Sequence, residues 1–254
     1  MDLKQAWNQA IISRTSRRSY KNKRISALKV AQIKQLIDMF NMESGLKIQF
    51  IDNGHEFLTG YKASYGMFSG TPAVIALVGN SQSEESKRLA GYYGEFLVLE
   101  CVSLDLGTCW ISGTFDKESC RKHIALDQED ELICIIAAGI VRENKSLKER
   151  IISQVGKSKQ TFNELLKEAS DTPPLWVKLG IEAARFAPSA VNGKPIGYRY
   201  QDGQISVFIA KENHGNQEID LGISMAHFQL GALQGLQRGN WIKDSQSYRF
   251  QCEF

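Results

Sequence analysis

The feature that most constrains the fold of this 254-residue chain is a pattern that occurs twice. An apolar segment with helical periodicity follows two strand-like runs and leads into glycine and Trp-Ile, first at Leu106–Ile111 and again at Gly239–Ile242. A helix that is apolar on most of its faces belongs in the core of a fold. The repetition therefore predicts an internal duplication, with chance similarity as the alternative at this divergence.

In the first part of the chain, periodic apolar positions predict helices, and continuous or alternating apolar runs predict strands. The expected helices are Met1–Arg14, Ser26–Phe40 with an exit at Gly45, Ser83–Leu106 and Ser119–Ile124, and the expected strands are Leu46–Ile51, Ala73–Val78 and Leu132–Ala138. Thr108–Gly113 is expected to form a turn, and Arg142–Ser170 a charged, mostly helical stretch.

Thr172-Pro173-Pro174 is the one convincing break in the chain. The elements expected after it are a helix over Leu175–Ala187, strands near Gly197–Tyr200 and Ile205–Ala210, a helix over Asp220–Gln237 and a strand-like end. We therefore interpret residues 1–254 as one domain made of an N-terminal half, about 1–171, and a smaller C-terminal half, about 172–254.

The composition is that of an ordinary soluble globular protein, with 43% hydrophobic and 23% charged residues. The longest apolar run, Leu132–Val141, is shorter than the roughly 20 residues of a membrane span. The N-terminus does not have the pattern of a signal peptide. Five cysteines without a C-x-x-C pair argue against a disulfide framework. We expect a cytoplasmic protein that does not associate with membranes.

Positive charge is concentrated near the N-terminus, where no acidic residue lies between Leu3 and Ile37. Arg17, Arg18, Ser19 and Lys21 combine planar guanidinium donors, a hydroxyl and a point charge, a set that suits one phosphomonoester. A solvated basic turn is the alternative. A nucleic-acid partner is not expected, because no aromatic ladder or recognised module accompanies the charge. Lys157 and Lys159 are candidates to supplement phosphate binding, with a solvated helix face as their alternative.

Two further segments are candidates for holding a flat ligand. In Ala187–Pro195, a helix that stops at Pro188 is followed by a short turn whose backbone N–H groups are expected to be available to a polar ring edge. Its alternative is a simple helix end. In Trp110–Thr114, Gly113 permits close approach of backbone N–H groups to a ligand, and a plain helix-to-strand connection is the alternative.

Several functional classes lack their motifs in this sequence. No glycine-rich dinucleotide or P-loop signature, no H-E-x-x-H and no G-x-S-x-G occurs. The four histidines are far apart and lack metal-ligand spacing. His227 lies beside Ile223 and Leu230 on its expected helix, which favours a packing role over that of a base or ligand.

These segments together resemble motifs of the nitroreductase family of FMN-dependent oxidoreductases. Arg17–Lys21 is similar to the family's Arg-Arg-Ser-x-Arg motif, and Gly107–Gly113 is similar to its Gly-Leu-Gly-x-x-Trp-x-Gly motif. Ala187–Pro195 is similar to Ala-Pro-Ser-x-x-Asn-x-Gln-Pro, and Lys157–Lys159 is similar to Lys-x-Arg. Lys21, Lys159 and Lys194 stand where the family usually has Arg, Arg and Gln. The resemblance implies an α+β fold with a mostly antiparallel sheet flanked by helices, and FMN at a homodimer interface.

The order of the motifs differs from that of the family, where the Ala-Pro-Ser motif follows the phosphate motif closely. Here the Ser26–Phe40 segment lacks it, and the motif occurs late, in the second half. We infer a fused pseudo-dimer that forms a single complete site between its halves and binds about one FMN per chain. The chain would act as a monomeric pseudo-dimer or dimerise further.

The resemblance also implies the chemistry and the residues. NAD(P)H would reduce FMN, and a small acceptor such as a nitroaromatic or quinone would reoxidise it, with no catalytic side chain required. The implied cofactor-binding residues are Arg17, Arg18, Ser19, Lys21, Lys157 and Lys159 for the phosphate and ribityl chain, Trp110, Ser112 and Gly113 near the ring, and Pro188, Ser189, Ala190, Asn192 and Lys194 at its edge and opposite wall. A non-catalytic FMN-binding protein for storage, sensing or sequestration is the alternative.

Overall fold

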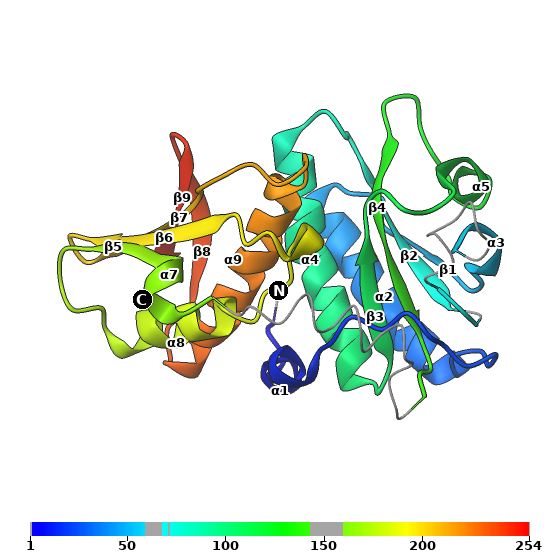
Figure 1. The fold of residues 1–254 in the computed structure, drawn as a ribbon, viewed down its shortest axis with the longest axis horizontal. Helices are drawn as coiled ribbons and strands as arrows, with labels where there is room; N and C mark the ends of the chain where they lie inside the picture. The colour runs from blue at the N-terminus through cyan, green and yellow to red at the C-terminus, as the bar shows by residue number, and fades with distance from the viewer. Residues whose placement is uncertain (1, 59–67, 71, 143–159, 254) are drawn as a thin grey trace.

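Two β-sheets lie on either side of a central pair of long helices, α4 (Glu84–Ser103) and α9 (Gln217–Gln234), in the computed structural model of the chain (Figure 1). The structure describes residues 2–58, 68–70, 72–142 and 160–253. The two central helices pack directly against each other. The fold is therefore organised around their contact.

The first sheet has the order β1-β2-β4-β3 and is antiparallel throughout. Its strands are β1 (Gln49–Ile51), β2 (Ala73–Gly79), β3 (Gly107–Ile111) and β4 (Glu131–Gly139), and its helices are α1 (Gln5–Ser13), α2 (Ala27–Ser44), α3 (His55–Leu58) and α5 (Lys117–Arg121). Every residue of β2 is buried. Ile75 and Leu77 pack in one core cluster with α1, α2 and α4, whereas Val74 and Ala76 pack in another with α3 and α5. Covering of both sheet faces explains the continuous apolar run.

The second sheet has the order β5-β6-β7-β9-β8, in which only β5 and β6 are parallel. Its strands are β5 (Leu166–Ala169), β6 (Ile196–Gln201), β7 (Gln204–Ile209), β8 (Gly239–Asp244) and β9 (Ser247–Cys252), accompanied by α7 (Phe162–Leu165), α8 (Leu175–Ala184) and the 3-10 turn η2 (Ala190–Asn192). Phe228 of α9 stacks on Tyr198 of β6 with ring centroids 5.3 Å apart. Aromatic packing of this kind joins the sheet to the central helix.

The two halves repeat one topology. In the sheet orders, β1, β2, β4 and β3 occupy the places of β6, β7, β9 and β8, and α4 occupies the place of α9. Gly91 of α4 lies so close to α9 that an added Cβ would approach Ile219 O to 2.0 Å, and a Cβ on Gly222 would approach Arg88 O to 1.9 Å. The reciprocal glycine contacts mark a pseudo-two-fold axis between the helices. The α+β fold and the predicted duplication are confirmed.

The predicted turn at Thr108–Gly113 is wrong over its first residues, because Gly107–Ile111 form strand β3 and pair with β4. The chain leaves α4 earlier than expected, through Asp105 in a left-handed conformation (φ 59). Gly107 does not end the helix. It lets Arg17 lie close beside β3, since a Cβ there would lie 3.0 Å from the Arg17 Cβ and 2.3 Å from Val141 Cγ1. Close backbone approach is a general use of glycine within a strand.

A second correction concerns the predicted helical stretch Arg142–Ser170. Leu166–Ala169 form strand β5, whose hydrogen bonds to β6 outweigh its helical composition. Residues 143–159 lie outside the described part of the chain. Helix α8 begins at Leu175, directly after Thr172–Pro174, as predicted.

Across the described ranges, none of the helices combines the length and apolar character needed to cross a membrane. All five cysteines are free. The prediction that no disulfide framework exists is therefore confirmed.

Candidate functional site

The basic segment Arg17–Lys21 is held by its backbone against the first sheet. Arg17 N donates to Thr108 O at 2.8 Å, and Lys21 N donates to Ile140 O at 2.7 Å. Tyr20 is buried, and its hydroxyl donates to Arg17 O at 2.7 Å. Sequence reasoning gave Tyr20 no role, because an aromatic residue in a basic segment carries no signal of burial. The structure shows that Tyr20 anchors the segment.

The basic side chains differ in exposure. Arg17 is buried, and its Nη2 donates to Arg142 O at 2.8 Å, so this guanidinium helps hold the segment in place. Arg18 and Ser19 are half-buried, and Lys21 is exposed. Lys157 and Lys159, which were also predicted to bind phosphate, lie outside the described residues. Arg18 and Lys21 are thus the basic side chains of the segment that reach the surface.

The predicted ring-contact segment lies at the end of β3. Trp110 is half-buried, and its Nε1 donates to Glu95 Oε2 at 2.8 Å. Ser112 is half-buried and Gly113 is exposed. A Cβ added to Gly113 would meet nothing within 4 Å, so the space beside this backbone is open. A flat ligand can therefore approach the backbone here.

The Ala187–Pro195 segment forms a closed loop at the end of α8. The expectation that its backbone N–H groups are available is wrong at four positions. Ala190 N donates to Asp220 Oδ1 at 2.9 Å, Asn192 N to Ser189 O at 3.0 Å, Gly193 N to Ala190 O at 2.9 Å, and Lys194 N to Ser189 Oγ at 3.0 Å. Two of these bonds close the 3-10 turn itself, and the other two go to the side chains of Asp220 and Ser189. Ligand contacts from these positions would have to come from side chains or carbonyl groups.

The loop has a strained backbone. Val191, Asn192 and Lys194 have φ values of 45°, 57° and 50°, which place non-glycine residues in the left-handed region. Each such residue costs on the order of 1 kcal/mol or more, and this strain must be offset by surrounding contacts. Val191 is 79% exposed despite its apolar side chain. A strained loop with an exposed apolar tip is the type of element that proteins use for binding.

Asp220 and Asn213 supply the contacts that hold this loop. Asn213 Nδ2 donates to Ala190 O at 2.9 Å and to Asp220 Oδ2 at 2.6 Å. Burial raises the pKa of Asp220 from 3.8 to about 6, although the bonds from Asn213 and Ala190 favour the carboxylate. The sequence did not indicate a role for either residue. Asp220 has the pattern of an ordinary helix start, and Asn213 lies in a polar connection between predicted elements.

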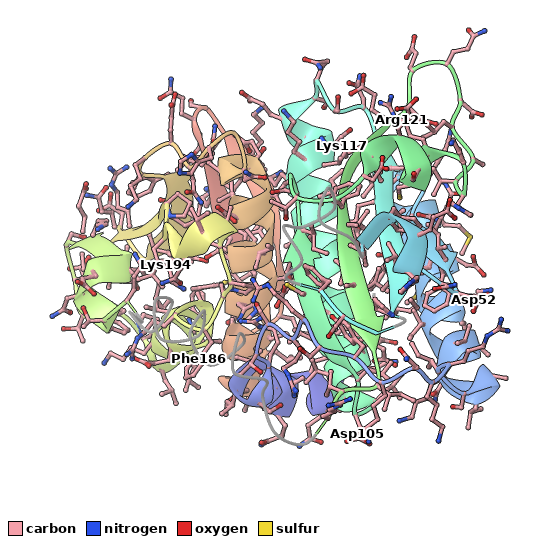
Figure 2. All side chains as sticks on the ribbon, turned by 45° about the vertical axis from the view of Figure 1, so that its right-hand side comes forward. Asp52, Asp105, Lys117, Arg121, Phe186 and Lys194 are labelled. Atoms are coloured by element: carbon pink, nitrogen blue, oxygen red, sulfur yellow. The ribbon has the colours of Figure 1, made fainter. Side chains whose placement is uncertain are left out.

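The candidate segments attach to one side of the central helices. Trp7, Ala10 and Ile11 of α1 share a core cluster with Ala183 and Ala187 at the end of α8, and Trp110 packs against the same cluster. From α1, the chain continues along the first sheet through Arg17–Lys21, shown in blue in Figure 1. Figure 2 labels Phe186, which directly precedes the loop, and Lys194, which lies within it, among the elements of the second half.

Comparison with known proteins identifies the family. Residues 7–232 match the family model described as "Putative TM nitroreductase", and the chain belongs to this nitroreductase family. A crystal structure described as a "putative nitroreductase" from Thermotoga maritima is 17% identical, covers 98% of this chain and 95% of its own, and superposes with a TM-score of 0.62. This likeness shows that the two proteins share a fold.

Smaller structures match about half of the chain. A nitroreductase with bound FMN from Desulfitobacterium hafniense is 16% identical and covers 56% of this chain and 93% of its own, with a TM-score of 0.45. An FMN-dependent nitroreductase from Clostridium difficile is 17% identical and covers 54% of this chain and 88% of its own, with a TM-score of 0.44. Among curated proteins, no sequence is significantly similar to this chain.

Proposed function

We propose that the protein is an FMN-dependent oxidoreductase in which NAD(P)H reduces bound FMN and a small acceptor, such as a nitroaromatic or a quinone, reoxidises it. One observation carries the proposal. The basic segment occurs only in the first half and the strained loop only in the second, yet the helices that lead into them pack in the same core cluster. Membership of the nitroreductase family and the FMN named for two similar structures support it.

The chemistry of the donor set fits FMN. Arg18 and Lys21 place cationic donors at the surface, which suits a phosphate dianion. The open space beside Gly113 would accept a planar ring system. Val191 presents an exposed apolar side chain that would gain from contact with such a ring.

In this proposal the bound flavin supplies the hydride chemistry, and the protein binds and orients it. Arg17, Arg18, Ser19 and Lys21 would hold the phosphate and ribityl chain. Trp110, Ser112 and Gly113 would lie near the ring, and Pro188, Ser189, Ala190, Asn192 and Lys194 would form its edge and opposite wall. Lys157 and Lys159 remain proposed phosphate ligands.

The proposed stoichiometry is about one FMN per chain, because each half would contribute a different part of one site. The halves are proposed to be about 1–171 and 172–254, with β5 adding to the sheet of the second half. The protein would act as a single-chain pseudo-dimer or as a homodimer of such chains. A cytoplasmic location is proposed because all five cysteines are free, as expected in a reducing compartment.

The test is the flavin content and turnover of the purified protein. We expect a yellow preparation that releases FMN, with a flavin-to-chain ratio near one, and that oxidises NADH or NADPH when a nitroaromatic or quinone is supplied. A ratio near two would contradict the single-site arrangement. A yellow protein whose flavin neither nicotinamide reduces would leave FMN storage, sensing or sequestration as the function. A colourless protein that does not take up added FMN would contradict the proposal altogether.

A further inference from the structure

Glu95, a fully buried carboxylate on α4, contacts three segments that lie far apart in the sequence. Its Oε2 accepts the 2.8 Å hydrogen bond from Trp110 Nε1 at the end of β3. Its Oε1 lies 2.9 Å from His227 Nε2 on α9 and 3.8 Å from Arg14 Nε. Arg14 directly follows α1 and lies three residues before Arg17. A single side chain thus joins β3, α9 and the connection between α1 and the basic segment.

His227 extends this connection to the strained loop. The histidine is fully buried, and its Nδ1 lies 3.1 Å from Ala183 O in the last turn of α8. A carbonyl oxygen only accepts hydrogen bonds, so Nδ1 carries a proton and donates it. A proton must then also lie between His227 Nε2 and Glu95 Oε1, on one atom or the other. Glu95 and His227 therefore share one proton, and through this pair a chain of hydrogen bonds runs from Trp110 to the end of α8.

The pseudo-two-fold axis provides an internal comparison for this pair. Trp110 follows Gly91 at the same spacing as Trp241 follows Gly222. Counted in the same way from the two glycines, Glu95 corresponds to Ala226 and His227 corresponds to Phe96. On that opposite side of the axis both residues are apolar and fully buried, and Trp241 Nε1 donates to the backbone of Met225 at 3.3 Å.

Comparing the Glu95–His227 pair with the Ala226–Phe96 pair shows whether the packing of the two central helices explains the buried charge. The fold fills the opposite position with an apolar pair, so packing of α4 against α9 does not require charge there. A buried ionisable pair is generally no more stabilising than an apolar pair of similar volume. The polar pair nevertheless occurs on the side where Trp110, Arg17 and the Ala187–Pro195 loop lie. The location favours a role in the site over a role in stability.

We propose that Glu95 and His227 are positioning residues of the FMN site. Their shared-proton hydrogen bond fixes the Trp110 indole relative to the last turn of α8, and so sets the distance between the β3 end and the strained loop. This inference rests on the proposed function, because it assigns the pair to the flavin site of that function. The pair touches neither substrate nor cofactor in this arrangement and acts through Trp110 and Ala183.

The chain itself suggests the decisive variant. The double substitution Glu95→Ala with His227→Phe copies the Ala226–Phe96 pair from the opposite side and removes both members of the hydrogen-bonded pair together. Arg14 and Trp110 Nε1 also lose their contact with Glu95. Glu95→Gln is the conservative variant, because its amide can accept from Trp110 and donate to His227 Nε2. Glu100→Gln is the matched control. Glu100 is buried on the same helix, and it accepts from Trp7 Nε1 and from Lys4 Nζ, both at 2.7 Å, at the N-terminal end of the chain.

The experiment measures the FMN dissociation constant of each folded apoprotein by fluorescence, together with its thermal midpoint. We expect the double variant to fold with a midpoint close to that of the native protein and to bind FMN about tenfold more weakly. Glu95→Gln and Glu100→Gln should both stay near the native affinity. A folded double variant whose affinity changes no more than that of Glu100→Gln would overturn the proposal.

A second variant decides the question if the double variant does not fold. His227→Gln can keep the bond to Glu95 but loses the bond to Ala183 O, so only the link to α8 is removed. We expect weaker FMN binding and faster hydrogen exchange of the Ala187–Lys194 amides. Affinity and exchange equal to those of Glu100→Gln would overturn the inference.

The proposed function and this inference fail in different ways. If the native protein binds no FMN, the proposed function falls, and hydrogen exchange of Ala187–Lys194 becomes the readout. Faster exchange in the variants would then support positioning of the loop by the pair, and unchanged exchange would overturn it. If the native protein binds FMN and the folded variants bind it equally well, only the inference falls.

Discussion

The ends of α2 and α8 show how two copies of one topology have diverged. Both helices precede the corresponding strands β1 and β6. Helix α2 continues to Ser44, and Gly45 ends it in the left-handed conformation. Its last turns bury Phe40 completely against Tyr93 and Phe96. Helix α8 ends at Ala184, and a strained loop occupies the space before β6.

The difference teaches that one copy of the element serves the core, whereas the other ends in the strained loop that we propose binds FMN. Within a continuous helix the backbone groups bond to one another, so the last turns of α2 need no side chain from another element to hold their backbone. The loop at 187–195 instead depends on Asp220 and Asn213 from α9 and the segment before it. On α4, the position equivalent to Asp220 is Leu89, which packs against the core. The support is thus present only beside the loop.

The largest expected effect comes from filling the loop. Replacing Ser189 and Asn192 together by leucine should abolish measurable FMN binding, because apolar bulk replaces the polar groups proposed to meet the ring. The fold should persist, since both residues are half-buried, lie in the loop after α8 and belong to none of the core clusters. FMN titration and circular dichroism check this. Met42→Ala, at the 81% exposed end of α2, is the control in the other half. Retained FMN affinity in the double variant would return the loop to a plain helix end.

The next effect tests the symmetry of the two halves. Gly91→Ala and Gly222→Ala should each lower the free energy of unfolding by about 3 kcal/mol or more, because the new Cβ would overlap backbone on the other central helix. Denaturant unfolding measures both. Gly113→Ala, whose Cβ meets nothing within 4 Å, is the control and should leave stability nearly unchanged. Strongly unequal losses at Gly91 and Gly222 would argue against a symmetric crossing.

Asp220 predicts a pH dependence whose sign follows from its raised pKa. In the folded protein the Asp220 carboxyl has a pKa of about 6, against 3.8 ordinarily, so the folded state binds its proton more tightly than the unfolded state does. Protonation of Asp220 therefore stabilises the fold fully below about pH 4, and this stabilisation is lost as the pH rises through 6. Asp220→Asn removes this dependence. The stability of the variant relative to the native protein should therefore rise between about pH 4 and 6, by on the order of 3 kcal/mol. A flat difference across this range would show that burial does not shift Asp220.

The smallest expected effect concerns the phosphate. Arg18→Gln should weaken FMN binding by about 2 kcal/mol, the range of a hydrogen bond to a charged group, while binding of riboflavin should not change. Calorimetry with the two flavins measures the difference. Lys23→Gln, an exposed basic residue outside the motif, serves as the control. Equal losses for FMN and riboflavin would place Arg18 away from the phosphate.

Much of the fold was predictable because its signals are local. The apolar runs of β2 and β4 and the periodicity of α4 and α9 reflect burial that repeats along each segment. The recurrence of glycine and Trp-Ile indicated the duplication for the same reason. Strand β3 was missed because Gly107 is typical of a helix end. Only the structure shows why glycine stands there: Arg17 lies so close beside β3 that a Cβ on Gly107 would collide with it.

The candidate site divides in the same way. Residue types and their order by themselves determined the basic segment, the Ala187–Pro195 segment and the separation of the two between halves. Only the tertiary structure decided that the loop's own bonds use its N–H groups, that Asp220 supports the loop, and that Glu95 meets His227 and Trp110. The physical reason is that periodicity reports the burial of a segment, whereas the partner of a buried polar group is chosen by the packing of segments distant in sequence.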